Sequence, residues 1–240
     1  MTPTITVASY NMRKAIGTDR RRRPDRILEV LHEIDADIVA LQEADRRFGA
    51  KLSAIPIDLI AERSDYRPVG FDVRPGGIGW HGNAILVRKS AVITACRPLD
   101  LPVLEPRGAV LADVRIGGAT MRIVGMHLDL SGLWRRRQAK AVIAHVAACE
   151  QALPTVLMGD LNEWSLHGGC LRDFGGTYRF APTGRSYHAR RPMAALDRIL
   201  VGPGVAVIDS GVHHSHKASL ASDHLPIWAK LHVPGDAGAR

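Results

Sequence analysis

The chain has 240 residues, of which 46% are hydrophobic, so a single domain can bury a core without help from disulfide bonds. Its 32 Lys and Arg residues exceed its 24 Asp and Glu residues, and the net charge of +8 favours a polyanionic partner such as nucleic acid, anionic lipid or a phosphorylated metabolite. No apolar run is long enough to span a membrane, and the three cysteines, Cys96, Cys149 and Cys170, lack the spacing of a metal site. We therefore expect reduced, buried cysteines and a cytoplasmic location, which the absence of a signal-peptide pattern before the first strand also favours.

The first part of the chain predicts alternating strands and helices. In chain order these are a strand over 4–10, a basic loop over 11–23, a helix over 24–34, a strand over 37–43 and a helix over 52–62. Pro24 stands at a favoured first-turn position, and Leu31 and Ile34 continue the helical spacing that begins after it. The second strand is apolar and ends in the carboxylate of Glu43.

The remainder of the chain predicts more strands than helices. It contains a glycine-rich loop over 70–82, strands over 83–88, 108–116, 121–127, 154–158, 195–201, 205–212 and 226–231, and a long helix over 131–148. Gly117 and Gly118 predict a hairpin turn. Because hairpins and helical crossovers both occur, the pattern indicates a mixed sheet, or two packed sheets with helices outside. We expect one domain over 1–233 and a disordered tail over 234–240.

Polar side chains stand directly at the ends of these apolar strands. They are Asn11, Glu43, His127 with Asp129, Asp160 with Asn162, and Asp223 with His224. Taken singly, each has an ordinary explanation as a turn residue, a surface acid, a core histidine or a helix cap. Since α/β proteins place their ligands at strand ends, we expect the whole set to converge on one rim of the fold.

Six short motifs resemble those of the endonuclease/exonuclease/phosphatase superfamily, in that family's order. They are Ser9-Tyr10-Asn11, Leu41-Gln42-Glu43, Gly125-Met126-His127-Leu128, Gly159-Asp160-Leu161-Asn162, Leu196-Asp197-Arg198-Ile199-Leu200 and Ser222-Asp223-His224-Leu225-Pro226. The resemblance covers residues 4–232. It implies an α/β fold of two packed mixed β-sheets flanked by helices, as in DNase I, and metal-dependent hydrolysis of a phosphate ester by in-line attack of water.

The resemblance also implies a metal site and a base. Glu43 matches the principal metal ligand, with Asn11 and Asp223 beside it, and such oxygen donors suit Mg²⁺, with Mn²⁺ as the alternative. His224 matches the base that activates water. Asp197 would accept the other ring proton of His224 and hold the ring in orientation.

The remaining matches imply contacts to water and phosphate. Asp160 and Asn162 would position the attacking water and the phosphate, and His127 would donate to a non-bridging oxygen or to the departing group. Arg107 resembles an arginine that lies near the phosphate in DNase I-like members. The hydrogen-bond partner of His127 stays open, with Asp129 as one candidate.

The motifs leave the substrate open. The tyrosine-bearing motif and the tryptophan-rich segment of abasic-site endonucleases are missing, and the segment 186–192 resembles short bacterial members. The leading hypothesis is a nuclease, supported by the positive charge. The alternative is a phosphodiesterase or phosphatase acting on a phospholipid headgroup or a small phosphorylated metabolite, and a third is a catalytically silent binding protein. We expect the loops over 20–23, 70–82 and 178–191 to determine which substrate binds. The arginine run over 135–137 is expected either to form a solvated helix face or to bind an anionic partner.

Overall fold

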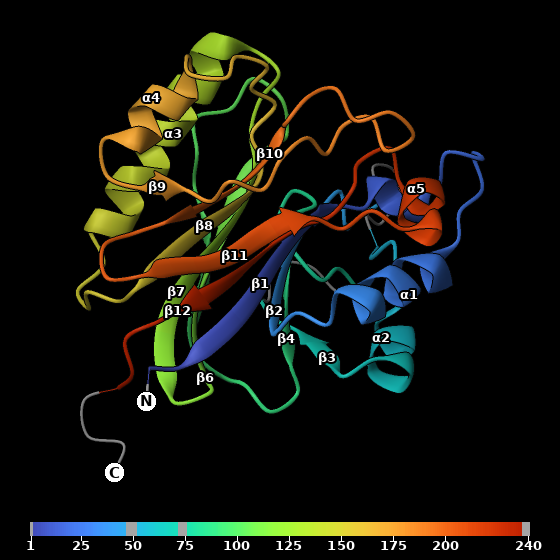
Figure 1. Cartoon of the computed structure of the whole chain (residues 1–240), viewed down its shortest axis with the longest axis horizontal. Helices are drawn as coiled ribbons and strands as arrows, with labels where there is room; N and C mark the ends of the chain where they lie inside the picture. Colours follow the sequence, from blue (N-terminus) through green and yellow to red (C-terminus); the bar gives the residue numbers. More distant parts are fainter. Residues whose placement is uncertain (1, 47–51, 72–75, 237–240) are drawn as a thin grey trace.

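Two six-stranded sheets packed face to face form the body of the molecule, and helices cover their outer sides (Figure 1). The computed structural model describes residues 2–46, 52–71 and 76–236. Both sheets contain parallel and antiparallel pairs. The predicted pair of packed mixed sheets flanked by helices is confirmed.

The first sheet has the strand order β11-β12-β1-β2-β4-β3. Its strands are β1 (Thr4–Asn11), β2 (Ile38–Gln42), β3 (Tyr66–Pro68), β4 (Ala84–Arg88), β11 (Ala206–Val212) and β12 (Ile227–His232). β1 runs parallel to β2 and antiparallel to β12. The ends of β1 and β2 and the start of β12 therefore lie at the same rim.

The second sheet has the strand order β5-β6-β7-β8-β10-β9. Its strands are β5 (Val92–Leu99), β6 (Gly108–Ile116), β7 (Ala119–His127), β8 (Thr155–Asp160), β9 (Arg179–Phe180) and β10 (Asp197–Val201). A turn with positive φ at Gly117 and Gly118 joins β6 to β7, as the glycine pair predicted. β7 and β8 are parallel and end together, beside the start of β10.

Helices cover the two outer faces. α1 (Pro24–Ile34), α2 (Ile57–Arg63) and α5 (His216–Ala221) lie on the side of the first sheet, and α3 (Gly132–Ala147) and α4 (Cys170–Gly175) on the side of the second. A short 3-10 helix, η1 (Arg13–Ala15), follows β1. No helix in the described part of the chain is long and apolar enough to cross a bilayer.

The two-residue alternation of each strand divides the core into layers. In β1, Ile5 and Val7 point between the sheets, whereas Ala8 and Tyr10 point toward the helices. In β8, Met158 points between the sheets and Leu157 toward α3 and α4. The sheets approach so closely that a Cβ at Gly125 would lie 3.3 Å from the Cβ of Ala40.

Continuing the same alternation to the strand ends places polar residues on the inner face. Asn11 ends β1, His127 ends β7, Asp160 ends β8 and Asp197 begins β10, each with the parity of the residues that point between the sheets. His127 and Asp197 are the direct partners of Asp160 on its two neighbouring strands. The predicted convergence of these residues therefore follows from strand parity.

Six elements of the described chain were not predicted from the sequence: η1, β3, β5, β9, α4 and α5. β5 is an edge strand with a single buried residue, and the others are exposed or half-buried, so it lacks the apolar alternation that reveals a strand. The second helix begins at Ile57, five residues later than predicted, because Pro56 keeps the residue before it out of the helical region.

The expected tail and cysteines differ in part from the structure. The Asp236 carboxylate accepts hydrogen bonds from the backbone N–H and the hydroxyl of Thr120, and residues 237–240 lie outside the described residues. No disulfide joins the three cysteines. Cys170 is buried as expected, whereas Cys96 and Cys149 are half-buried.

We predict that Gly159→Ala destabilises the protein by more than about 2 kcal/mol. Gly159 has a φ of 155°, and a Cβ there would lie 1.8 Å from the carbonyl oxygen of Met126 on the neighbouring strand. Urea denaturation followed by circular dichroism measures the change. Gly175→Ala is the matched control, because outside its own helix the nearest described atom to its added methyl is in the Phe180 ring, at 3.9 Å. Equal stability of the two variants would contradict the prediction.

Candidate active site

The carboxylate of Asp160 is the meeting point of the rim. It is almost fully buried, and its Oδ2 accepts a hydrogen bond from Asn11 Nδ2 at 2.9 Å. Nε2 of His127 lies 3.4 Å from the same oxygen, and Nε2 of His224 lies 3.8 Å from it. One carboxylate oxygen thus joins residues from β1, β7 and the segment before β12.

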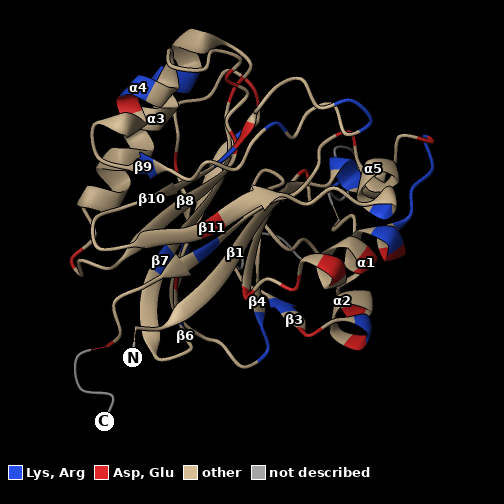
Figure 2. Cartoon of the chain, in the orientation of Figure 1, with Lys and Arg blue, Asp and Glu red and all other residues tan. Residues whose placement is uncertain are grey.

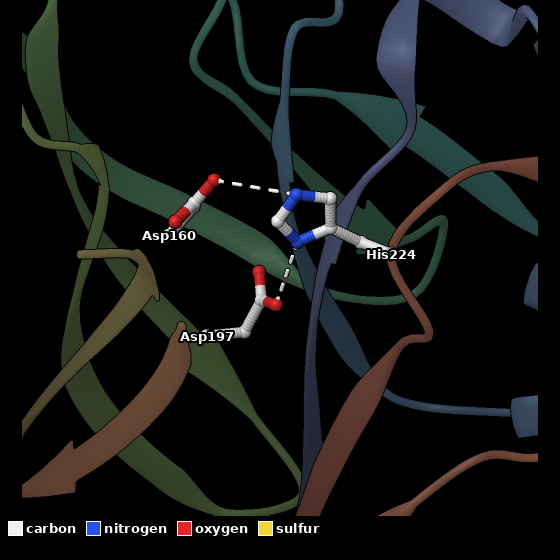
Figure 3. Close-up of side chains that lie close together, drawn as sticks. All are labelled: Asp160, Asp197 and His224. Carbon is white, nitrogen blue, oxygen red and sulfur yellow. Dashed lines mark hydrogen bonds and ion pairs between the residues drawn. The ribbon is translucent and has the colours of Figure 1, made fainter. Parts of the chain in front are cut away.

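His224 is held from its other side by Asp197 (Figure 3). The distance from His224 Nδ1 to Asp197 Oδ2 is 2.8 Å, and the Ser186 hydroxyl donates to the same oxygen. Asp197 Oδ1 is buried and has no hydrogen-bond partner in the described part of the chain. Asp197 therefore orients the His224 ring so that Nε2 points toward Asp160 and the rim.

The two histidines have opposite electrostatic environments. Burial lowers the pKa of His224, but Asp197, Asp160 and Asp223 outweigh burial and raise the pKa to about 10. For His127, burial dominates and lowers the pKa to about 3, with Arg107 and His224 lowering it further and Asp160 opposing them. At neutral pH His127 is therefore the uncharged ring and His224 the charged one.

Arg107 lies against His127 at the start of β6. Its Nη1 is 2.9 Å from His127 Nδ1 and also contacts Nε2 of the same ring. Arg107 contacts both ring nitrogens, whereas the carboxylate of Asp160 can only accept, so the ring proton of neutral His127 lies on Nε2, 3.4 Å from Asp160 Oδ2. Asp129 instead accepts hydrogen bonds from the backbone N–H groups of Glu105 and Ser131, so the partners observed for His127 are Arg107 and Asp160.

Asn162 forms hydrogen bonds that hold Asp160 in place at the rim. Its side-chain amide donates to the carbonyl of Leu128 at 2.9 Å, and its backbone N–H donates to Asp160 Oδ1 at 3.0 Å. Its φ of 50° is in the left-handed region, which is uncommon for a residue other than glycine. Asn162 therefore fixes the second oxygen of Asp160 and connects it to the chain that follows β7.

The three predicted metal ligands lie near η1. Lys14 forms an ion pair with Glu43, and Nε of Arg13 lies 3.3 Å from Asp223 Oδ2. The Asn11 side-chain oxygen accepts a hydrogen bond from the backbone N–H of Arg13 at 3.1 Å. Both carboxylates are partly exposed and already attract cationic groups, so their chemistry fits a hard divalent cation.

A pocket of about 430 Å³ opens beside His127. Lys14, Arg46 and Arg107 provide positive charge in its wall, and Glu43 lies among them. The pocket thus connects the predicted metal ligand Glu43 to the predicted phosphate ligands His127 and Arg107. Its size and its mixture of charges suit a small phosphate ester or one phosphate group of a larger molecule.

An aromatic pair on the opposite side was missed by the sequence analysis. The Tyr187 ring lies 4.8 Å from the His224 ring, and Trp164, which is 64% exposed, stands edge-on to Tyr187 at 6.0 Å. Lys14 and Ser186 were also missed. Trp164 follows the Gly-Asp-Leu-Asn motif by two residues, so its place next to that motif was the available signal.

The two arginine runs differ in environment (Figure 2). Arg20, Arg21, Arg22 and Arg23 are exposed on the loop before α1. Arg135 is buried, its Nη1 donates to the carbonyl of Leu130 at 2.6 Å, and its Nη2 lies 3.3 Å from Glu163 Oε2. The solvated face considered for 135–137 is therefore wrong for Arg135.

The fold is of the DNase I-like class: two mixed sheets pack together, and acids, amides and imidazoles meet at one rim. A model of the Endonuclease/Exonuclease/phosphatase family matches residues 8–224, and the chain belongs to this family. Proteins of this family are phosphoester hydrolases. A search of the curated proteins found no match.

Solved structures share the fold at low sequence identity. A family member from Bacteroides vulgatus is 20% identical with a TM-score of 0.75, over 96% of this chain and 99% of that one. A mannosyl-6-phosphatase from Bacteroides thetaiotaomicron is 22% identical with a TM-score of 0.74, over 95% and 99%. D. rerio TDP2 in complex with a single-strand DNA product is 16% identical with a TM-score of 0.72, over 95% and 98%.

We predict that acid destabilises the metal-free protein less when His127 is replaced by Gln. The folded-state pKa of about 3 lies below the unfolded value of about 6.5, so the unfolded state takes up the proton first and stability is lost as the pH falls from about 6.5 toward 3. Urea denaturation of wild type and His127→Gln between pH 6.5 and 4 measures the two slopes. His224 does not interfere, because it is protonated in both states over most of that range. Parallel slopes would contradict the assignment of a neutral His127.

Proposed function

We propose that the protein is a divalent-metal-dependent phosphodiesterase whose substrate is a nucleic acid. The observation that carries the reaction is the convergence of Asn11, His127 and His224 on Asp160 Oδ2, with Arg107 behind His127. Such a rim offers one phosphate a base in His224, hydrogen-bond donors in Asn11 and His127, and the positive charge of Arg107. These are the groups that in-line attack of water on phosphorus requires.

His224 is the proposed base, and Asp197 its positioning residue. The 2.8 Å contact to Asp197 fixes Nδ1, so Nε2 is the atom that would take a proton from water. Asp160 and Asn162 would hold that water beside the phosphate. Neutral His127 would donate a hydrogen bond to a phosphoryl oxygen or to the leaving oxygen, and the positive charge at this position would come from Arg107.

Glu43, Asp223 and Asn11 would hold the metal, with Mg²⁺ as the proposed ion and Mn²⁺ as the alternative. A bound divalent cation would stabilise negative charge on the phosphoryl oxygens, and its field would lower the pKa of His224 toward neutrality. Binding would require Lys14 and Arg13 to leave the carboxylates that they contact. Their side chains would then be available to the phosphate itself.

Two features support nucleic acid as the substrate. The net charge of +8 attracts a phosphate backbone, and the exposed Trp164 stands beside Tyr187 at the His224 side of the rim. An exposed indole next to the reacting phosphate is a platform for a base or a sugar. We place this reaction in the cytoplasm, in line with a chain that uses no disulfide.

A phosphatase or phosphodiesterase for a small phosphorylated metabolite or a lipid headgroup is the second candidate. The pocket of about 430 Å³ beside His127 favours it, because a pocket of that size with Arg46 and Arg107 in its wall can enclose a sugar phosphate. A mannosyl-6-phosphatase with the same fold is consistent with that substrate size.

We predict that Glu43→Gln and His224→Ala each lower phosphoester cleavage about 10²- to 10⁴-fold, since one loses a metal ligand and the other the base. The measurement is turnover of bis-p-nitrophenyl phosphate and plasmid DNA with Mg²⁺ or Mn²⁺, with and without EDTA. Glu62→Gln and His214→Ala, both exposed and neither a proposed site residue, are the matched controls. Activity that survives EDTA or both substitutions would sink the proposed chemistry.

We predict that Trp164→Ala raises the KM for single-stranded DNA about tenfold and that for bis-p-nitrophenyl phosphate much less, because one nitrophenyl ring offers less stacking than the bases of the polymer. Steady-state kinetics on the two substrates gives the comparison. Equal effects on both substrates would remove Trp164 from substrate binding. If the wild type cleaves sugar phosphates but neither DNA nor RNA, the second candidate replaces the first.

A further inference from the structure

Arg198 is a buried guanidinium with an incomplete set of partners. The residue is only 9% exposed, and its one hydrogen bond to another described residue runs from Nη1 to the backbone carbonyl of Asp197 at 3.1 Å. It forms no ion pair with a carboxylate within the described ranges 2–46, 52–71 and 76–236. Burial lowers its pKa, which reflects the free-energy cost of keeping this charge away from water.

The guanidinium borders a pocket of about 540 Å³ that is separate from the catalytic rim. Because β10 alternates, Arg198 leaves the strand on the face opposite to Asp197, toward α4 rather than toward the space between the sheets. Arg172 and Arg185 also line the pocket, together with His167. No Asp or Glu among the described residues lines it.

The rest of the wall is largely apolar. Leu171 is buried below it, Phe180 is half-buried, and Leu166 is 67% exposed at its edge. Such a wall offers little to water and much to a hydrocarbon or aromatic group. Arginine binds phosphate-like oxygens through paired N–H donors, and that binding gains strength in a partly buried site.

We propose that this pocket is a second ligand site, for a small organic anion that carries a phosphate or phosphonate group on an apolar body. The anionic group would bind Arg198, with Arg185 and Arg172 adding charge, and the apolar body would lie against Phe180 and Leu171. The site is independent of the proposed catalytic function. Neither its donors nor its apolar wall overlaps the set that meets at Asp160.

The pocket also adjoins the segment that contacts Asp197, the proposed positioning residue of His224. Thr183, Gly184 and Arg185 line it, and the next residue, Ser186, donates to Asp197. The backbone amides of Thr183 and Gly184 are therefore local reporters of occupancy. Amides at Gly82 and Arg107, in the first pocket, report on the other site.

Calorimetry with phenylphosphonate in the presence of EDTA tests the site. Phenylphosphonate has no phosphate ester bond and is therefore not hydrolysed, and EDTA removes any metal from the rim. The intact chain should bind one equivalent, and inorganic phosphate should bind more weakly because it lacks the apolar body. Arg198→Met should weaken binding at least about tenfold, and Arg185→Ala should weaken it less. Arg63→Ala, an exposed arginine of α2, and Arg107→Met should bind as the wild type does.

Amide chemical-shift mapping decides the location. Saturable shifts at Thr183 and Gly184, with Gly82 unmoved, support the site, and Arg185→Ala retains this readout if Arg198→Met fails to fold. Unchanged affinity in Arg198→Met and Arg185→Ala would overturn the proposal, as would shifts centred on Gly82 and Arg107 or the absence of saturable binding. Binding to phosphatidic acid vesicles without binding of phenylphosphonate would also overturn it, because the ligand would then be a lipid surface.

Discussion

Close packing of the two sheets is the constraint on which the rest of the structure depends. The inner faces must be apolar wherever the sheets touch, as Ile5, Val7 and Met158 are, and the small Gly125 lets the backbones approach. One end of each central strand lies at the rim, and the requirement for an apolar inner face ends there. Asn11, His127, Asp160 and Asp197 occupy those strand ends. The geometry of these four residues is therefore set by rigid strands, which suits chemistry that tolerates little displacement. Glu43, Asp223 and His224 lie just outside the strands, after β2 or before β12.

Two buried carboxylates at this rim, Asp160 and Asp197, share one charged histidine. Asp160 and Asp197 are buried next to each other on paired strands, and one oxygen of Asp197 has no hydrogen-bond partner among the described residues. Two buried carboxylates need positive charge nearby, and His224 lies between them and supplies it. His127 lies closer to Asp160, at 3.4 Å against 3.8 Å for His224, but its burial disfavours the charged ring, and the positive charge of Arg107 opposes a second one beside it. The difference between a charged and a neutral histidine therefore follows from burial together with these neighbours.

The sequence predicted the strand ends well and the loops poorly, for a physical reason. Apolar runs that stop at a polar residue are visible as local patterns, so Asn11, Glu43, His127 and Asp160 could be placed at strand ends and expected at one rim. The hydrogen-bond partner of His127 could not be predicted, because Arg107 reaches it from the position before β6 and no local pattern records such a contact. Likewise α4 and α5 have six residues each, too few for a helical repeat to stand out, and β5 is an exposed edge strand. Ser186, Tyr187 and Trp164 lie in irregular segments whose path depends on tertiary contacts.

The segment after β1 shows how the rim and the loops are coupled. Arg13, Lys14 and Ala15 all have positive φ, and each such residue costs about 1 kcal/mol or more when it is not glycine. The same turn brings Arg13 to Asp223 and Lys14 to Glu43, so two further carboxylates of the rim are neutralised by it. Without those contacts the rim would gather four acids around one charged histidine, and their mutual repulsion would oppose folding. The ion pairs of Arg13 and Lys14 with the two acids thus offset the backbone strain in η1. Any cation or phosphate that enters the rim must compete with these ion pairs.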